Sequence, residues 1–126
     1  NPMLTRDAIL ASMQRRTTTE SSLVFGGAMR VRELLRSEYR EAQAAARNDA
    51  VMPNDRFNAM IFATAVVDDA GGPLFTADDV LLWPERSAVW NEVLRIAQLA
   101  LDLSEVGTDA LKKPSSASPE TTDATP

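Results

Sequence analysis

The sequence of 126 residues contains no cysteine and no histidine. Without cysteine there is no disulfide framework, zinc–thiolate site, iron–sulfur cluster or thiol nucleophile. Without histidine there is no Ser-His-Asp or Cys-His catalysis, no histidine-based metal site, and no side chain suited to proton transfer near neutral pH. These absences predict a protein that is not an enzyme and that needs no metal or other cofactor.

Positive charge and long apolar runs are also scarce. The sequence contains 13 Lys and Arg residues and 18 Asp and Glu residues, for a net charge of −5. General nucleic-acid binders need a basic face that neutralises phosphates. The longest apolar stretch, Met60–Val67 with Thr64 inside it, is far shorter than the ~20 residues of a membrane span. We therefore expect neither a nucleic acid nor a membrane as partner.

The C-terminal segment from Lys112 to Pro126 contains no large apolar residue. Such a segment cannot bury enough surface to offset the entropy lost on ordering. We expect one domain over residues 4–105 and a flexible, disordered tail over residues 106–126. A domain of ~100 residues can build a core, although a thin one.

The apolar pattern predicts a mainly α-helical fold with a small N-terminal β-hairpin (α+β), arranged as a compact bundle of about four to five helices. Thr5 is a candidate N-cap for a short first helix, which the β-branched run Thr17–Thr19 is expected to end. Further helices are expected from Ser37 to Asn48, from Asn54 to Val66, from Thr76 to Trp83, and from Glu85 to about Ser104. The helix up to Val66 is apolar around most of its girth and is predicted to be the central one.

Two β-prone runs, residues 22–25 and 28–34, flank Gly26-Gly27. Glycine takes positive φ readily, so this arrangement predicts a hairpin near residues 22–34. In the second run Met29 and Val31 alternate with Arg30 and Arg32. Alternation with period two predicts one buried and one solvated face.

The last predicted helix has an unusually wide apolar surface. Its residues form two adjacent stripes, one containing Val89 and Val93 and the other Trp90, Leu94, Ala97 and Leu101. One small domain rarely covers so wide a face, so the surface is either core or a contact for another chain. The candidate partner or self-association surface is Val89, Trp90, Val93, Leu94, Ala97 and Leu101, with Arg30 and Arg32 as a candidate polar rim.

Paired acidic residues raise the question of a cation site. Asp68-Asp69 and Asp78-Asp79 match no calcium-loop spacing. The first pair lies in a turn-rich segment that includes Gly71-Gly72, and Thr76 with Asp79 resembles a capping box. Turn formation and capping are therefore the preferred interpretation of both pairs.

Three segments in this order resemble a known family. They are Leu4–Leu10, then Gly26-Gly27 leading to Val31–Leu34, then Val67–Thr76 before a short acidic helix. Together they resemble the tail assembly chaperones of long-tailed (siphovirus-type, lambda-like) bacteriophages, over residues 3–103. The resemblance implies a small, mainly helical domain with an N-terminal hairpin and no active site.

The resemblance also implies a function. Such a chaperone coats the tape measure protein, keeps it soluble, recruits tail tube protein, and is absent from the mature virion. It implies action in the host cell cytoplasm, homo-oligomer formation, and a frameshift-extended form of the same protein. The rival hypothesis is a structural virion protein, such as a head–tail connector or tail-completion protein. Presence in purified virions discriminates between the two.

Overall fold

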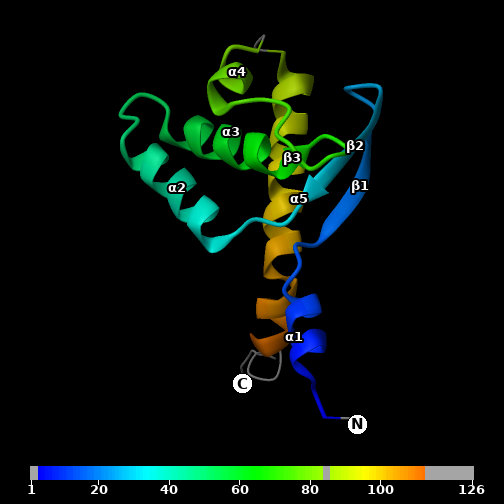
Figure 1. Cartoon of the computed structure of the whole chain (residues 1–126). Coiled ribbons are helices and arrows are strands. Elements are labelled where there is room, and N and C mark those ends of the chain that lie inside the picture. The colour runs from blue at the N-terminus through cyan, green and yellow to red at the C-terminus, as the bar shows by residue number, and fades with distance from the viewer. Residues whose placement is uncertain (1–2, 84–85, 113–126) are drawn as a thin grey trace, which may run out of the picture.

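The structure is a computed structural model that describes residues 3–83 and 86–112, with side chains through Ser104. Within these residues the chain forms five helices and a three-stranded sheet, which confirms the predicted mainly helical α+β class. The elements are α1 (Arg6–Ser12), β1 (Thr17–Ser22), β2 (Gly27–Arg32), α2 (Arg36–Arg47), α3 (Pro53–Ala65), β3 (Val66–Val67), α4 (Ala77–Leu81) and α5 (Ser87–Lys112). Figure 1 shows α5 as the long axis of the molecule, with α3 crossing it and α1 at the end of the molecule towards which α5 runs.

The hairpin is confirmed, but its first strand was predicted in the wrong place. Strand β1 pairs antiparallel with β2 from Thr17 opposite Arg32 to Ser22 opposite Gly27. The threonines that were expected only to end a helix therefore form the strand, because β-branched residues favour a pleated backbone once a partner strand is present. The segment after Ser22, predicted as strand, is the turn, and Gly26 closes it with a φ of +79°.

A third strand was not predicted at all. Val66 was expected to be the last residue of helix α3, but Val66 and Val67 form β3 and pair antiparallel with Val31 and Arg30 of β2. The buried, β-branched valines leave the helix because β2 offers them backbone hydrogen bonds and a place in the core. This pairing fixes the hairpin against the end of α3.

Two helix starts follow the predicted capping pattern. The Ala8 N–H donates to Thr5 Oγ1 over 3.1 Å at the start of α1. At α4 the Asp79 N–H donates to Thr76 Oγ1 over 3.1 Å, and the Thr76 N–H donates to Asp79 Oδ2 over 2.9 Å. This reciprocal pair confirms the capping box.

Two other helix boundaries differ from the prediction. Ser37 does not cap α2; instead the Leu35 N–H donates to the Glu38 carboxylate over 2.9 Å. Helix α5 continues to Lys112, past the predicted end near Ser104. The flexible tail was predicted over residues 106–126, but residues 106–112 belong to α5. Residues 113–126, like the expected helix stop at Pro84, lie outside the described residues.

The core lies where α3 crosses α5 and the hairpin. Helix α3 is the central one, as predicted, and buries most of its second half. The fully or nearly fully buried apolar residues include Val31, Ala42, Ala59, Ile61, Phe62, Val80, Val93, Ile96, Ala97 and Ala100.

Candidate partner-binding site

The six predicted surface residues of α5 divide between the core and its margin. Val93 and Ala97 are completely buried within the chain and offer nothing to a partner. The other four are half-buried: Val89, Trp90, Leu94 and Leu101. The predicted surface is thus narrower than the sequence pattern suggested, because α3 and β2 cover its middle.

The half-buried residues Trp90, Leu94 and Leu101 follow one side of α5. Trp90 and Leu101 pack against the core, whereas Leu94 is half-buried beside the exposed, polar face that carries Gln98. A leucine in this position leaves part of its apolar surface in water. We refer to Trp90, Leu94 and Leu101 as the α5 stripe.

The predicted polar rim does not border the α5 stripe. The Arg32 guanidinium donates to the carbonyl oxygens of Thr64, over 3.1 Å, and Gly71, over 3.3 Å. Arg30 lies 3.9 Å from the Asp69 carboxylate. These contacts tie the outer face of the hairpin to the end of α3 and the turn after β3, so Arg32 holds the fold together.

A groove that the sequence did not indicate lies between the hairpin turn and the start of α5. Its volume is about 430 Å³, and apolar side chains from five parts of the chain line it. They are Phe25, Met29, Phe62, Val66, Leu74, Phe75, Trp83 and Val89. We call this the apolar groove.

Four aromatic rings pack against one another in the apolar groove. Trp83 meets Phe75 edge-on with a 5.0 Å centroid distance, and it meets Phe25 and Phe62 at 5.9 and 5.7 Å. Such tilted and edge-on pairs are each favourable beyond the area they bury. The chain has only seven aromatic residues, and four of them gather here. The sequence shows only that the chain has few aromatic residues. The four rings in the groove come from segments up to about 60 residues apart, so their cluster could not be predicted from the sequence.

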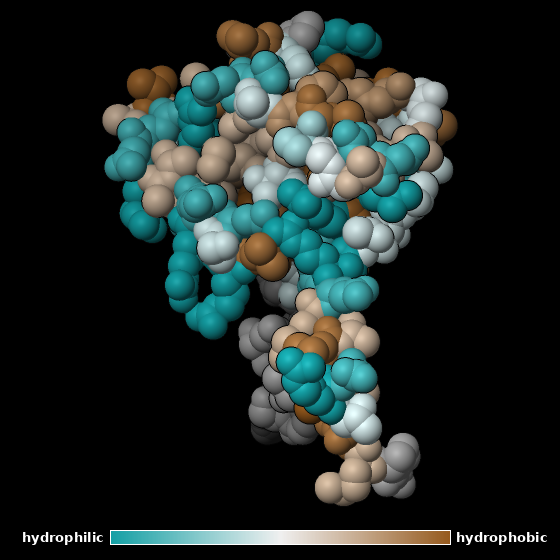
Figure 2. Space-filling model, in the orientation of Figure 1, coloured by the Kyte–Doolittle hydropathy of each residue, from teal (hydrophilic) through white to brown (hydrophobic). Residues whose placement is uncertain are grey.

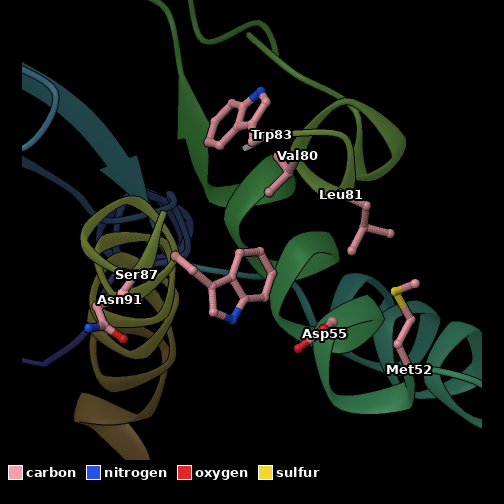
Figure 3. Close-up of a pocket in the computed structure, with 8 residues that line it drawn as sticks. Met52, Asp55, Val80, Leu81, Trp83, Ser87 and Asn91 are labelled. Atoms are coloured by element: carbon pink, nitrogen blue, oxygen red, sulfur yellow. The ribbon is translucent and has the colours of Figure 1, made fainter. Parts of the chain in front are cut away.

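A second hollow of about 430 Å³ lies on the other side of Trp83, between the start of α3 and α5. In Figure 3 Met52, Asp55, Leu81 and Asn91 surround it. Trp90 also lines it, so neighbouring residues of α5 serve different hollows: Val89 the apolar groove and Trp90 this one. The lining here mixes polar and apolar side chains, which makes it less suited to an apolar partner.

An ion-pair cluster holds the hairpin to α5. Arg95 donates two hydrogen bonds of 2.8 Å to the buried Glu92 carboxylate and one of 2.6 Å to Glu20 of β1. It also donates to the Ser21 carbonyl oxygen over 3.1 Å. The hydrogen bonds from Arg95, helped by one from Ser22, lower the pKa of Glu92 from 4.5 to about 2. The cluster therefore fixes the wall of the apolar groove that the hairpin supplies.

The acidic pairs act as the turn and cap that the sequence indicated. Asp68 accepts hydrogen bonds of 2.9 Å from the N–H groups of Ala70 and Gly72, while Asp79 caps α4. Among the residues described, no three Asp or Glu side chains gather closely enough to hold a metal ion. Within that same part of the chain, no helix has the length and apolar character to cross a membrane.

Comparison with solved structures points to one protein. The structure of the bacteriophage HK97 tail assembly chaperone matches with a TM-score of 0.56, over 79% of this chain and 98% of that one, at 18% identity. This chain has the fold of that tail assembly chaperone. No protein-family model matches the sequence, and neither does any curated protein. At 18% identity this match shows a shared fold, and it agrees with the resemblance found in the sequence.

Proposed function

We propose that the protein is a non-enzymatic tail assembly chaperone of a long-tailed bacteriophage. In this role it binds the tape measure protein in the host cytoplasm, keeps it soluble, and brings tail tube subunits to it. The observation that carries the proposal is the match to nearly the whole HK97 tail assembly chaperone. The match covers 79% of this chain and 98% of that one, so it is not limited to one common motif.

The partly exposed Leu94 of the α5 stripe supports the proposal that the partner is apolar. Leu94 leaves part of its side chain outside the core, between Trp90 and Leu101, which pack inward. A tape measure protein is long and apolar, and a shallow apolar stripe suits many weak contacts along it better than one deep pocket does. Contacts of this kind exclude water without holding the partner permanently.

The test is co-expression of the tape measure protein with Leu94→Asp, with Gln98→Glu as a control that adds the same charge on the exposed face of α5. A charge in a desolvated contact is strongly unfavourable. We expect Leu94→Asp to fold by circular dichroism and yet to lose most of the soluble tape measure protein, while Gln98→Glu retains it. A folded Leu94→Asp variant that solubilises its partner like the parent would rule out the stripe.

Mass spectrometry of purified virions tests the class of function separately. A chaperone is displaced during assembly and should be absent from the particles. A fixed number of copies per virion would instead identify a structural protein, such as a head–tail connector or tail-completion protein.

A further inference from the structure

Both tryptophans of the chain line the second hollow, the one between the start of α3 and α5. Trp83 follows α4, and Trp90 lies in the first turn of α5. Both side chains are partly buried and pack against the core. Rings that the fold already holds need little further ordering when a ligand binds. We call this site the tryptophan hollow.

The tryptophan hollow also contains a carboxylate without a cation beside it. Asp55 lies in the first turn of α3, where the helix dipole favours an acid, and it is exposed. The carboxylates of Asp49 and Asp78, by contrast, both accept hydrogen bonds from Arg56, over 3.2 and 2.8 Å. Among the residues that the structure describes, no cation forms an ion pair with Asp55. The helix dipole therefore accounts for an acid at this position but leaves its charge open to a ligand.

Two opposing walls form the tryptophan hollow. Figure 3 shows Met52 and Asp55 at the start of α3 on one side, and Ser87 and Asn91 of α5 on the other. Ser87 and Asn91 are exposed, and their hydroxyl and amide groups can form hydrogen bonds with a main chain. The hollow thus combines aromatic rings, one free negative charge and a polar edge that is open to solvent.

This combination of groups matches a guanidinium ion. A cation over the face of an aromatic ring is attracted by the ring quadrupole, and tryptophan gives the strongest such interaction. The planar guanidinium stacks on aromatic rings and donates two parallel hydrogen bonds to a carboxylate, whereas an ammonium is a compact, strongly hydrated charge. An anion would be repelled by Asp55.

We propose that the tryptophan hollow accepts an arginine side chain of a partner protein. The guanidinium group stacks on the indole rings and donates to the Asp55 carboxylate, while the main chain of the partner crosses the edge at Ser87 and Asn91. Arg86 of the same chain is not among the described residues that line the hollow. The site is therefore open to an arginine from another protein.

The charge of the whole molecule favours such a partner. The net charge is −5, and Figure 2 shows a largely hydrophilic surface on this face of the molecule, with apolar side chains in separate groups. An acidic protein attracts a basic segment from a distance, and an arginine anchored in a hollow gives that attraction a fixed position. The inference concerns a charged contact and stands apart from the α5 stripe and from tape measure binding.

Intrinsic fluorescence tests the proposal directly, because both tryptophans of the chain line the hollow. The probe is capped glycyl-arginyl-glycine, titrated into the full chain at low salt. The control peptide carries citrulline, which has the shape of arginine without its charge. We expect a saturable change with the arginine peptide and about tenfold weaker binding of the citrulline peptide. Absence of a saturable change, or equal affinity for the two peptides, would overturn the proposal.

Two carboxylate variants separate Asp55 from the net charge of the chain. Asp55→Asn removes the acceptor's charge, and Asp102→Asn removes an exposed carboxylate of α5 that lies about 16 Å along the helix from Asn91. Both should fold like the parent by circular dichroism, because both side chains are exposed. The arginine peptide should bind Asp55→Asn about three- to tenfold more weakly and Asp102→Asn like the parent. A folded Asp55→Asn variant with the parent's affinity would refute the assignment.

Three further measurements identify the source of the cation. Methylguanidinium should bind more weakly than the arginine peptide, because it lacks a main chain to meet Ser87 and Asn91; equal affinity would indicate a site for a small free cation. Arg86→Met should bind the peptide like the parent, and tighter binding would show that Arg86 itself fills the hollow. The peptide should leave the sedimentation of the chain unchanged, and dissociation of oligomers would show that a second copy fills it. Any of these three alternatives would overturn the proposal.

Discussion

Removing the Arg95 side chain should weaken the fold in a way that depends on pH. Arg95→Met leaves Glu92 buried without the cation that stabilises its charge. A pKa lowered from 4.5 to about 2 corresponds to roughly 3 kcal/mol of folding free energy. Because the Arg95 side chain is 45% exposed, solvent screens the pair, and we expect a loss of ~2 kcal/mol at pH 7.

The pH dependence follows from the direction of the shift. Glu92 has a lower pKa in the folded protein than in the unfolded chain, so its contribution is complete above the unfolded pKa of 4.5 and is lost as the pH falls towards 2. The difference in unfolding free energy between parent and Arg95→Met should therefore shrink to less than half of its neutral value by pH 3. Urea denaturation at pH 7, 5 and 3 measures it.

Two further variants isolate the interaction. Arg86→Met removes an exposed arginine from the start of the same helix and should change the unfolding free energy by less than ~0.5 kcal/mol. A double-mutant cycle with Glu92→Gln should give a coupling energy of ~1 kcal/mol or more at pH 7. If Arg95→Met resembles Arg86→Met, or if its cost is the same at pH 7 and pH 3, the cluster does not hold the hairpin as argued.

Three other predictions concern stability and can be checked by urea or thermal denaturation. Phe62→Ala should lower the free energy of unfolding by ~3–5 kcal/mol, because it empties a buried position that three other aromatic rings surround. A loss below ~1 kcal/mol would contradict that packing. Gly26→Ala should lower the free energy of unfolding by ~1–2 kcal/mol, because Gly26 has a φ of +79°. Gly27→Ala should be tolerated, since nothing lies within 4 Å of the added methyl group. Equal losses for the two variants would refute the turn argument. Deletion of residues 113–126 should leave Tm within about 2 °C of the parent, and a fall of several degrees would show that the tail docks on the body.

Features that depend on neighbouring residues could be predicted from the sequence. Thr76 and Asp79 lie three residues apart, so the capping box needs only one turn of helix. The alternation that buries Val31 and leaves Arg30 exposed likewise follows from the period of a strand. The apolar density of α3 predicted its central place, because no other position could remove so much apolar surface from water.

Features that depend on distant segments required the tertiary structure. Thr17–Thr19 favour strand formation and also favour the end of a helix, and pairing with β2 decided in favour of the strand. Val66 and Val67 continue an apolar helical pattern, and the same strand drew them into the sheet. In each case a hydrogen-bonding partner more than ten residues away outweighed the local preference, which amounts to only a few tenths of a kcal/mol per residue.

The candidate binding surfaces show the same division. The sequence by itself determined that α5 has more apolar residues than a narrow helix face requires, and that the chain has no cysteine or histidine for chemistry. Only the tertiary structure decided that Val93 and Ala97 are core and that Leu94 is not. The reason is physical: periodicity records which residues share a side of a helix, whereas burial depends on which other elements reach that side.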